Sequence, residues 1–285
     1  MNIAIVGYGK MGKMVEQIAD KRGIKAKFII DPKYQGGRSL VGKYPGMTSV
    51  RKFCEEYSKD FDGVAIDFTE PSAALENIKL YCEYHIDCVV GTTGWNKIAA
   101  NMEDVRNMVE KSGITMVYSA NFNSTVQAVF LLNRIAAAMF DGLPGFDVGI
   151  REGHHPDKKD PSGTGIALAR DIIGKEYFDK TALRTQLDGP VKPHEIFMAI
   201  ERLGGIVGFH EITYTNDARD GSAQNDAVKI SHRAGNRSGF ANGALDAAEW
   251  LLAHTDQNRG LVHWPDVVRQ NFLSSINREL GTNMK

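Results

Sequence analysis

Residues 2–12, with the sequence NIAIVGYGKMG, leave few folds open to this chain. A short β-branched run ends at Val6, three glycines follow with the spacing G-x-G-x-x-G, and a helical pattern of apolar residues continues to Gly23. The next apolar run ends at Asp31. A strand, a glycine turn, a helix and a second strand that ends in an acid are typical of a dinucleotide-binding βαβ unit.

The glycine turn predicts how a dinucleotide would bind, although a turn that serves only packing is the alternative. The glycines permit close approach of the backbone, the helix N-terminus attracts a pyrophosphate, and Asp31 accepts hydrogen bonds from a ribose. Because Asp31 would repel a 2′-phosphate, we expect NADH to be preferred, with NADPH possible since Lys33, Arg38 and Lys43 follow. The expected cofactor-binding residues here are Gly7, Tyr8, Gly9, Lys10, Met11, Gly12 and Asp31.

Further apolar runs alternate with helical patterns at residues 63–69, 88–94 and 115–120. This alternation predicts a doubly wound parallel sheet, in which ligands lie at the carboxyl ends of the strands. The segments GTTG and SANF end the last two runs, where they either line the nicotinamide half of a groove or serve as ordinary turns. On the first interpretation, the further cofactor-binding residues are Gly91, Thr92, Thr93, Ser119, Ala120, Asn121 and Phe122.

The pattern changes after a helical segment at about 124–140. Longer runs that alternate apolar and polar residues follow, which indicates an antiparallel or mixed sheet with one wetted face. We therefore predict an α/β protein with an N-terminal Rossmann-type parallel sheet and a C-terminal α+β domain. The first domain is expected at residues 1–122 and is completed by the C-terminal helix, about 239–285. The segment GFANGALDAAEWLLAH, residues 239–254, is expected to be the final helix and to pack back on this domain. The second is expected at 123–238.

The segment REGHHPDKKDPSGTG, residues 151–165, holds more titratable groups than a connecting loop needs. Its DPSGTG part runs into a helical pattern, so Ser162, Gly163 and Thr164 present hydroxyls and backbone N–H groups at a helix N-terminus. Such a terminus attracts anions, and a carboxylate or a phosphate is the expected guest. The alternative is a solvated charged loop with a helix cap.

The same loop supplies candidates for proton transfer. His154 and His155 can titrate near neutral pH, and Lys158 or Lys159 adds a positive charge or a proton donor. A serine hydrolase is disfavoured because the G-x-S-x-G motif is missing, and a metal site is disfavoured because adjacent histidines rarely reach one ion. An anion site beside a proton donor remains, and no metal is expected.

The composition restricts the partners of the chain. A formal net charge of -1 argues against general attraction to nucleic acid or to an anionic membrane, so a small-molecule partner is expected. Three cysteines without metal-ligand spacing argue against a disulfide framework. No apolar stretch reaches the roughly 18 residues of a membrane-spanning helix, and the start of the chain does not resemble a signal peptide. We expect a cytoplasmic protein.

The motifs VGYGKMGK, IDFT, GTTG, EGHHPDKKDPSGTG and RLGGIVGFHE together resemble the 4-hydroxy-tetrahydrodipicolinate reductase (dihydrodipicolinate reductase) family. The resemblance implies NAD(P)H-dependent reduction of a cyclic imine dicarboxylate in diaminopimelate and lysine biosynthesis. Hydride would enter at C4, and the enzyme would protonate the neighbouring carbon. It also implies a homotetramer that pairs through the sheet of the second domain, which binds the substrate.

The resemblance also implies roles for single residues. The implied catalytic residues are His154 and Lys158, and the implied substrate contacts are His155, Ser162, Gly163 and Thr164. The loop after the lysine is one residue shorter than is usual in the family, which leaves Lys159 as a competitor of Lys158. Two other functions stay open, namely another Rossmann amino-acid or imine dehydrogenase and a catalytically silent paralogue that binds dinucleotide.

Overall fold

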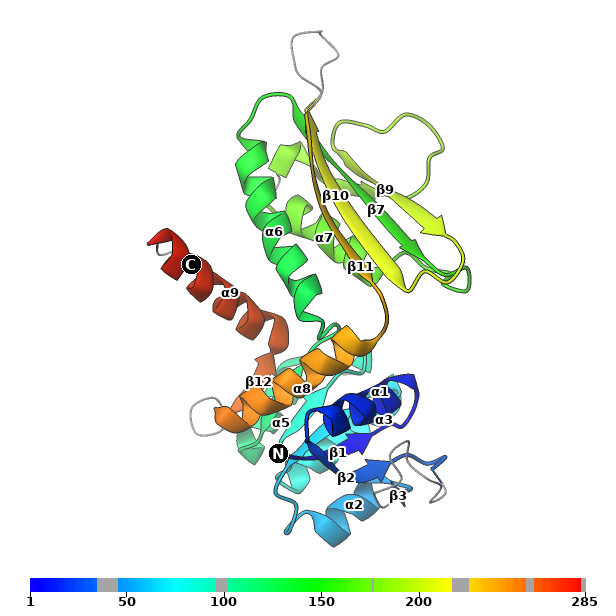
Figure 1. Cartoon of the computed structure of the whole chain (residues 1–285), viewed down its shortest axis with the longest axis vertical. Helices are drawn as coiled ribbons and strands as arrows, with labels where there is room; N and C mark the ends of the chain where they lie inside the picture. The colour runs from blue at the N-terminus through cyan, green and yellow to red at the C-terminus, as the bar shows by residue number, and fades with distance from the viewer. Residues whose placement is uncertain (35–45, 96–101, 176, 217–225, 255–258, 283–285) are drawn as a thin grey trace. The chain divides into compact units, whose positions relative to one another are not determined.

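The computed structural model divides the chain into two compact units (Figure 1). Unit 1 comprises Met1–Ser124 and Arg237–Lys285, and unit 2 comprises Thr125–Asn236. The residues that the structure describes are 1–34, 46–95, 102–175, 177–216, 226–254 and 259–282. Arg38 and Lys43 lie outside them.

Unit 1 is built on a seven-stranded parallel sheet with the strand order β12-β6-β5-β4-β1-β2-β3. The strands are β1 (Asn2–Val6), β2 (Lys25–Ile30), β3 (Gly46–Met47), β4 (Val64–Asp67), β5 (Cys88–Val90), β6 (Thr115–Tyr118) and β12 (Gly260–His263). The order runs outward from β1 in one direction and from β4 in the other. In such sheets, ligands bind at the carboxyl ends of the strands near this reversal.

Helices cover both faces of this sheet. Because the side chains on both faces are therefore buried, its strands are almost continuous apolar runs in the sequence. Ile3 and Ile5 of β1 pack with α1 (Lys10–Lys21), α8 (Ser238–Ala253) and the start of α9 (Trp264–Leu280). Ala4 and Val6 face the other core. That core lies under α2 (Val50–Tyr57), α3 (Pro71–Glu83) and α5 (Met102–Ser112).

The expectation that α8 is the final helix is wrong. The chain returns through β12, which extends the parallel sheet beside β6, and then forms α9. Trp264 and Val268 of α9 are buried in the same core as α8. A four-residue strand after a loop gives a weak sequence signal, so the pattern analysis passed over it.

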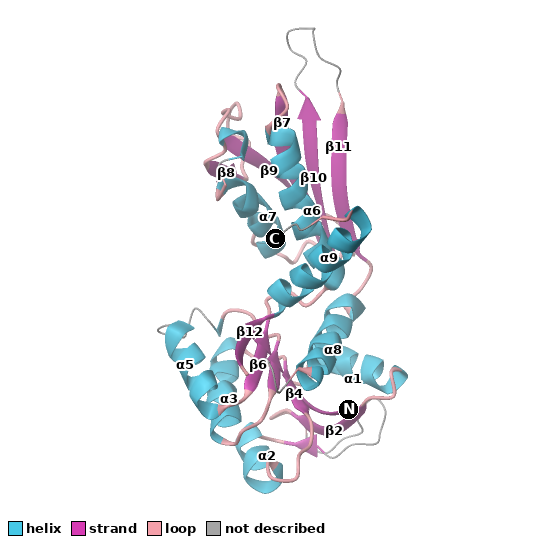
Figure 2. Cartoon of the chain, turned by 90° about the vertical axis from the view of Figure 1, so that its left-hand side faces the viewer, coloured by secondary structure: helices cyan, strands magenta, loops and turns pink. Residues whose placement is uncertain are grey.

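Unit 2 is a five-stranded mixed sheet with the order β11-β10-β7-β9-β8 (Figure 2). Its strands are β7 (Phe146–His154), β8 (Ala182–Arg184), β9 (Glu195–Arg202), β10 (Gly208–Asn216) and β11 (Ala227–Ala234). Strand β10 pairs antiparallel with β7 and β11, whereas β7 and β8 pair parallel with β9. The helices α6 (Ser124–Asp141) and α7 (Gly163–Ile173) cover one face.

The other face of this sheet is polar, as the alternating sequence predicts. Arg151 of β7 pairs with Glu201 of β9 and with Glu211 of β10, and Lys229 of β11 also reaches Glu211. The predicted fold class, a Rossmann-type parallel sheet followed by an α+β unit with a mixed sheet, is confirmed.

Candidate active site

A buried carboxylate organises the helix-covered face of unit 2 at the end of β7. Strand pairing sets Glu152 of β7 beside His210 of β10, and the Glu152 side chain is fully buried. Its Oε1 accepts hydrogen bonds from Arg202 Nη2 at 3.0 Å and from the Ser162 backbone N–H at 3.1 Å. Its Oε2 is bonded to Arg202 Nη1 at 3.1 Å and to His154 Nδ1 at 2.6 Å. Four contacts therefore saturate this carboxylate.

Electrostatics keep the Glu152 carboxyl ionised. Burial by itself would raise its pKa, but hydrogen bonds from Arg202, His154 and the Ser162 amide outweigh that effect. The net result is that the pKa of Glu152 lies below its usual range.

Arg202, at the end of β9, uses all five of its N–H donors. Two donate to the Glu152 carboxylate, and the other three donate to backbone carbonyls. The acceptors are the carbonyl oxygens of Lys158 at 2.7 Å, Glu201 at 2.7 Å and Asp160 at 2.9 Å. Two of these carbonyls belong to the titratable loop, so Arg202 ties that loop to the sheet.

His154 stands at the border between the buried face and solvent. Its side chain is 13% exposed. The imidazole lies over Gly208 of β10, where an added Cβ would come within 3.0 Å of His154 Nε2. It also meets the ring of His210 edge-on, with the ring centroids 5.5 Å apart.

His210 is neutral at physiological pH. Burial lowers its pKa, and the positive charges of His154, His232 and Lys158 lower it further. The negative charge of Glu152 acts in the opposite direction, and the resulting pKa is about 4. Its Nε2 lies 2.7 Å from Ser162 Oγ, and both side chains are buried.

The N-terminus of α7 begins beside this network. Ser162 is the N-cap residue, and its carbonyl accepts the first helical hydrogen bond from Ile166. The first N–H groups of a helix have no partner within it. A Cβ added at Gly163 would meet nothing within 4 Å, whereas one at Gly165 would come within 2.7 Å of Met198 Sδ. Open space therefore adjoins Gly163 and Thr164, while the Ser162 hydroxyl is turned toward His210.

The two lysines of the loop between His154 and α7 differ in their exposure to solvent. Lys158 is half-buried and Lys159 is exposed. The Lys158 N–H donates to the His155 carbonyl at 3.1 Å, which closes a turn. His155 is half-buried, and its Nδ1 lies 3.7 Å from Asp157. The Lys158 carbonyl accepts the hydrogen bond from Arg202 Nε, so this residue is tied directly to the end of β9.

The three glycines after β1 in unit 1 differ in how much space the structure leaves for a side chain. Gly7 has a φ of +84°, and a Cβ there would come within 2.7 Å of the Phe68 carbonyl oxygen. A Cβ at Gly12 would lie 2.1 Å from the Gly7 oxygen, so close packing of α1 requires this glycine. Gly9, the N-cap of α1, has an ordinary φ of -80° and no atom within 4 Å of an added Cβ. The protein itself does not require a glycine at this position.

The neighbours of these glycines lie at the same edge of the sheet. The Tyr8 N–H donates to Asp31 Oδ2 at 2.7 Å, and the Lys33 N–H donates to Asp31 Oδ1 at 2.8 Å. Asp31, which follows β2, is therefore held directly beside the glycine turn. Lys10 is exposed at the first position of α1, and Met11 packs partly against the core.

A second fully buried carboxylate, Asp67, lies at the end of β4. It accepts hydrogen bonds from Thr69 N and Oγ1 at 2.9 and 2.6 Å, Asn77 Nδ2 at 2.9 Å and Tyr81 Oη at 2.9 Å. Thr92 is buried and donates to the Thr69 carbonyl at 3.0 Å. This cluster ties the turns after β4 and β5 together.

The turns after β5 and β6 present backbone rather than side chains. Gly91 is covered by the Phe68 ring, since a Cβ there would come within 2.1 Å of it, and Thr93 is exposed. Ser119 Oγ bonds the backbone of Asn121, and Ala120 is exposed. Phe122 is 2% exposed and packs against Trp264. Its ring is thus a core residue.

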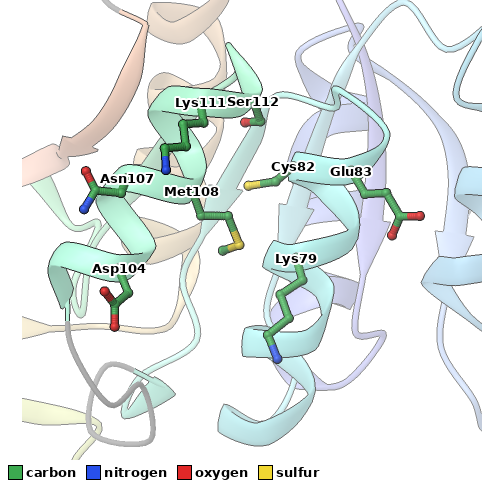
Figure 3. A pocket seen from close by; sticks show the side chains of 8 residues that line it. All are labelled: Lys79, Cys82, Glu83, Asp104, Asn107, Met108, Lys111 and Ser112. Atoms are coloured by element: carbon green, nitrogen blue, oxygen red, sulfur yellow. The ribbon is translucent and has the colours of Figure 1, made fainter.

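A surface pocket lies elsewhere in unit 1, between α3 and α5 (Figure 3). Cys82, Glu83 and Ser112 line it from the last turns of these helices, which lie at the amino ends of the strands. Burial raises the pKa of the Cys82 thiol, so the thiol stays protonated. This pocket is not a candidate for the reaction.

Among the residues that the structure describes, no group of three or more His, Cys, Asp or Glu side chains could hold a metal ion. In the same ranges, no helix combines the length and apolar character that crossing a membrane requires.

Comparison with known proteins gives a consistent result. The family model for the dihydrodipicolinate reductase N-terminus matches residues 1–122, and the model for its C-terminus matches residues 125–268. A 4-hydroxy-tetrahydrodipicolinate reductase from Christiangramia forsetii is 34% identical over 274 residues, which covers 95% of this chain and 99% of the relative. Another, from Chromobacterium violaceum, is 34% identical over 280 residues, with coverage of 94% and 98%.

Solved structures share the fold. A dipicolinate-bound dihydrodipicolinate reductase from Paenisporosarcina sp. TG-14 matches with a TM-score of 0.70 at 20% identity, covering 92% of this chain and 97% of that one. An amine dehydrogenase from Mycobacterium smegmatis matches with a TM-score of 0.60 at 10% identity, with coverage of 93% and 95%. At these identities, the similarity shows the fold alone.

The parallel sheet with its glycine turn, together with the second α+β unit, defines a Rossmann-type NAD(P)H-dependent oxidoreductase. Both family models match, and together they cover most of the chain. The chain belongs to the dihydrodipicolinate reductase family. The sequence-based assignment to this family and to this class of enzyme is confirmed.

Four residues in these networks were not predicted from the sequence, namely Asp67, Glu152, Arg202 and His210. All four stand inside motifs that carry the resemblance, namely IDFT, EGHHPDKKDPSGTG and RLGGIVGFHE. The alternation of β7 also gave a signal, because Glu152 must share a face with His154 two residues later. Two partners of Glu152, Ser162 and Arg202, lie 10 and 50 residues away, and no local sequence pattern specifies those pairings.

Proposed function

We propose that this chain reduces 4-hydroxy-tetrahydrodipicolinate to tetrahydrodipicolinate with NAD(P)H, as a step of diaminopimelate and lysine biosynthesis. The observation that carries the proposal is the juxtaposition of His154 with the N-terminus of α7 through the shared carboxylate of Glu152. The names of the relatives and the dicarboxylate named with the Paenisporosarcina structure support it.

The substrate half of the proposal concerns the end of β7 and the start of α7. Each carboxylate of a dicarboxylate needs a positively charged group or several hydrogen-bond donors to bind it. We assign one carboxylate to the backbone N–H groups and hydroxyl at Gly163 and Thr164, where the open space at Gly163 supports a ligand. His155 and Lys158 are assigned to the other end. Ser162 contributes through its place at the helix terminus, since its hydroxyl bonds His210.

The cofactor half concerns the turns after the strands of unit 1. The helix N-terminus at Gly9 suits a pyrophosphate, because space is open there and the backbone can come close. Asp31 is assigned to the adenosine ribose, which favours NADH over NADPH, and the turns at Gly91–Thr93 and Ser119–Asn121 are assigned to the nicotinamide half. Phe122 supports that turn from the core. When bound, the cofactor supplies the hydride.

The protein then has to position the substrate, neutralise it and deliver a proton. Because the substrate carries a 4-hydroxyl that the product lacks, that group leaves as water together with a hydrogen from the adjacent carbon. The carbon–carbon double bond formed in this way then takes up the hydride on one carbon and a proton on the other. His154 is assigned as the proton donor to the carbon next to the one that receives hydride, and Lys158 as the cation beside it. Lys158 is half-buried and its carbonyl is held by Arg202, whereas Lys159 is exposed, and this difference supports the choice between the two lysines.

The direct test follows NADH oxidation while the preceding synthase generates the cyclic imine from pyruvate and aspartate semialdehyde. Turnover that depends on the synthase is the expected result. Turnover only with a different imine or 2-oxo acid would favour another dehydrogenase of this fold, and NADH binding without any turnover would favour a silent paralogue.

The cofactor half has its own test, based on the different environments of the glycines. Gly9→Ala should weaken NADH binding roughly tenfold or more, about 1.4 kcal/mol, and leave thermal stability unchanged. Gly12→Ala is the matched variant, and it should lower stability because Gly7 leaves no room for a Cβ. Unchanged NADH affinity in Gly9→Ala would remove the pyrophosphate from this turn.

Assembly and location are part of the proposal. We propose a homotetramer that pairs through the sheet of unit 2. Light scattering should then give four times the chain mass of 31.4 kDa. A biosynthetic reductase works where its reduced cofactor is regenerated, so the cytoplasm is the proposed location.

A further inference from the structure

We propose that Glu152 and Arg202 form the positioning pair of this active site. In this proposal, Glu152 holds the Nδ1 hydrogen of His154 and so makes Nε2 the nitrogen that exchanges a proton, while Arg202 fixes the loop that carries Lys158. The inference deepens the proposed function and rests on it. Neither residue is assigned to touch the substrate.

The first step concerns the proton on His154. Nδ1 lies 2.6 Å from Glu152 Oε2, and an ionised carboxylate can only accept hydrogen bonds. Two hydrogen bonds from Arg202, one to each oxygen, keep the Glu152 carboxylate ionised inside the protein. Nδ1 must therefore carry its hydrogen in every state of the ring. Only Nε2 is left to gain and lose a proton.

The second step concerns the loop. Arg202 donates from Nε to the Lys158 carbonyl and from Nη2 to the Asp160 carbonyl, at 2.7 and 2.9 Å. The same guanidinium donates to Glu152, which in turn holds His154. One rigid planar group thus locates both proposed catalytic residues, His154 and Lys158, relative to each other. A lysine could not do this, because it has three donors at one point in place of five in a fixed fork.

The third step is a comparison within the same sheet. Arg151, on the opposite face, bonds Glu201 in a similar strand-to-strand pair, but its side chain is 49% exposed. That pair contacts neither the histidines nor the loop in the interactions found among the described residues. Arg151 and Glu201 therefore provide matched controls for the buried pair.

The first experiment reads the tautomer directly and needs no substrate. Nitrogen-15 NMR of histidine-labelled protein, assigned with His154→Gln, should show His154 protonated at Nδ1 in the wild type, and Glu201→Gln should leave that signal unchanged. In Glu152→Gln the amide can donate to Nδ1, so a population protonated at Nε2 should appear. A wild-type His154 protonated at Nε2 alone would overturn the assignment of Glu152.

The second experiment is a double-mutant cycle on turnover. Glu152→Gln should lower kcat about 10- to 100-fold, a part of what general acid catalysis contributes, with NADH affinity unchanged. In a His154→Gln background, the same change should cost less than about threefold, because the residue through which it acts is gone. Equal losses in both backgrounds would mean that Glu152 does not act through His154.

The third experiment concerns Arg202. Arg202→Lys should raise the Kd for dipicolinate, used as a stable dicarboxylate probe, roughly tenfold, whereas Arg151→Lys should leave it within about twofold. Equal Kd values in the two variants would overturn the role of Arg202. If the wild type fails to turn over the imine but shows the Nδ1 tautomer, the proposed reaction fails and the positioning of His154 stands.

Discussion

Two fully buried carboxylates, Asp67 of β4 in unit 1 and Glu152 of β7 in unit 2, differ in their partners. Asp67 in unit 1 accepts hydrogen bonds from uncharged donors, namely the amide and hydroxyl of Thr69, the amide of Asn77 and the phenol of Tyr81. Glu152 in unit 2 is bonded by a guanidinium, an imidazole and a backbone N–H.

The difference indicates what each carboxylate does. The uncharged donors around Asp67 hold the turns after β4 and β5 in place, and burial together with the neighbouring Asp67 raises the pKa of Tyr81. The Glu152 network includes a histidine that reaches the surface. A buried carboxylate that neighbours a titratable group is typical of sites that transfer protons. Unit 1 is therefore interpreted as a scaffold for binding and unit 2 as the source of the proton.

The largest expected effect comes from removing the two proposed catalytic residues. His154→Gln and Lys158→Ala should each lower kcat by about two to four orders of magnitude, with NADH affinity almost unchanged. Lys159→Ala is the matched control, and it should keep kcat within about threefold because Lys159 is exposed. Steady-state kinetics and NADH fluorescence titration provide the measurements. Near-normal turnover in both test variants would contradict the assignment of chemistry to unit 2.

The second prediction compares the two buried carboxylates, Glu152 and Asp67, when each is replaced by the amide of the same size. Glu152→Gln should lower the free energy of unfolding by about 3 kcal/mol, because an arginine cannot accept a hydrogen bond from the new amide. Asp67→Asn should cost only about 1 kcal/mol, since the hydroxyls of Thr69 and Tyr81 can reverse their hydrogen bonds. Urea unfolding followed by far-UV circular dichroism gives both values. Equal losses would remove the distinction between the networks.

The third prediction concerns the stability of the fold as the pH is lowered. The pKa of His210 is about 4 in the folded protein and 6.5 ordinarily, so the unfolded chain binds a proton first as pH falls. Stability should therefore decrease between these values, by at most about 3 kcal/mol from His210. The lowered pKa of Glu152 adds a further loss only below its ordinary value of 4.5, where the unfolded chain binds the proton first. His154, His232 and Lys158 also act on His210 and are present in the wild type and the variant alike. His210→Gln should flatten the dependence of stability on pH, and an unchanged slope would exclude His210 as its source.

The smallest effect concerns a third carboxylate, Asp31, which is half-buried and accepts two backbone N–H groups. Asp31→Asn should shift the ratio of kcat/KM for NADH and NADPH toward NADPH roughly tenfold, about 1.4 kcal/mol, by removing the charge that repels a 2′-phosphate. Asp60→Asn, an exposed change, is the control. An unchanged ratio would move the ribose away from Asp31.

Much of the fold was predictable because its signals are local. Runs such as residues 64–67 and 88–90 are buried on both faces, and helices cover both sides, so they read as continuous apolar strands. The alternation in β7 and β10 reflects a sheet with one core face and one charged face. Short strands such as β12 were missed, because four residues pair only through a neighbour that is distant in sequence.

The site was predictable in part. The glycine turn, Asp31 and the loop from His154 to Thr164 are contiguous in sequence and carry recognisable chemistry. Their surroundings were not predictable in detail. The sequence treats Ser162 as one of three equivalent cradle residues, whereas the fold turns its hydroxyl toward His210 and leaves space beside Gly163.

The sequence by itself determined the family, the class of enzyme and the segments that hold the candidate chemistry, because these depend on residue types at short spacings. Only the tertiary structure decided which groups are buried together. Strand pairing placed Glu152 between His210 and β9, and it brought Arg202 to the Lys158 loop. The physical reason is that a buried charge is stable only with partners, and in this fold those partners come from strands and loops far apart in the chain.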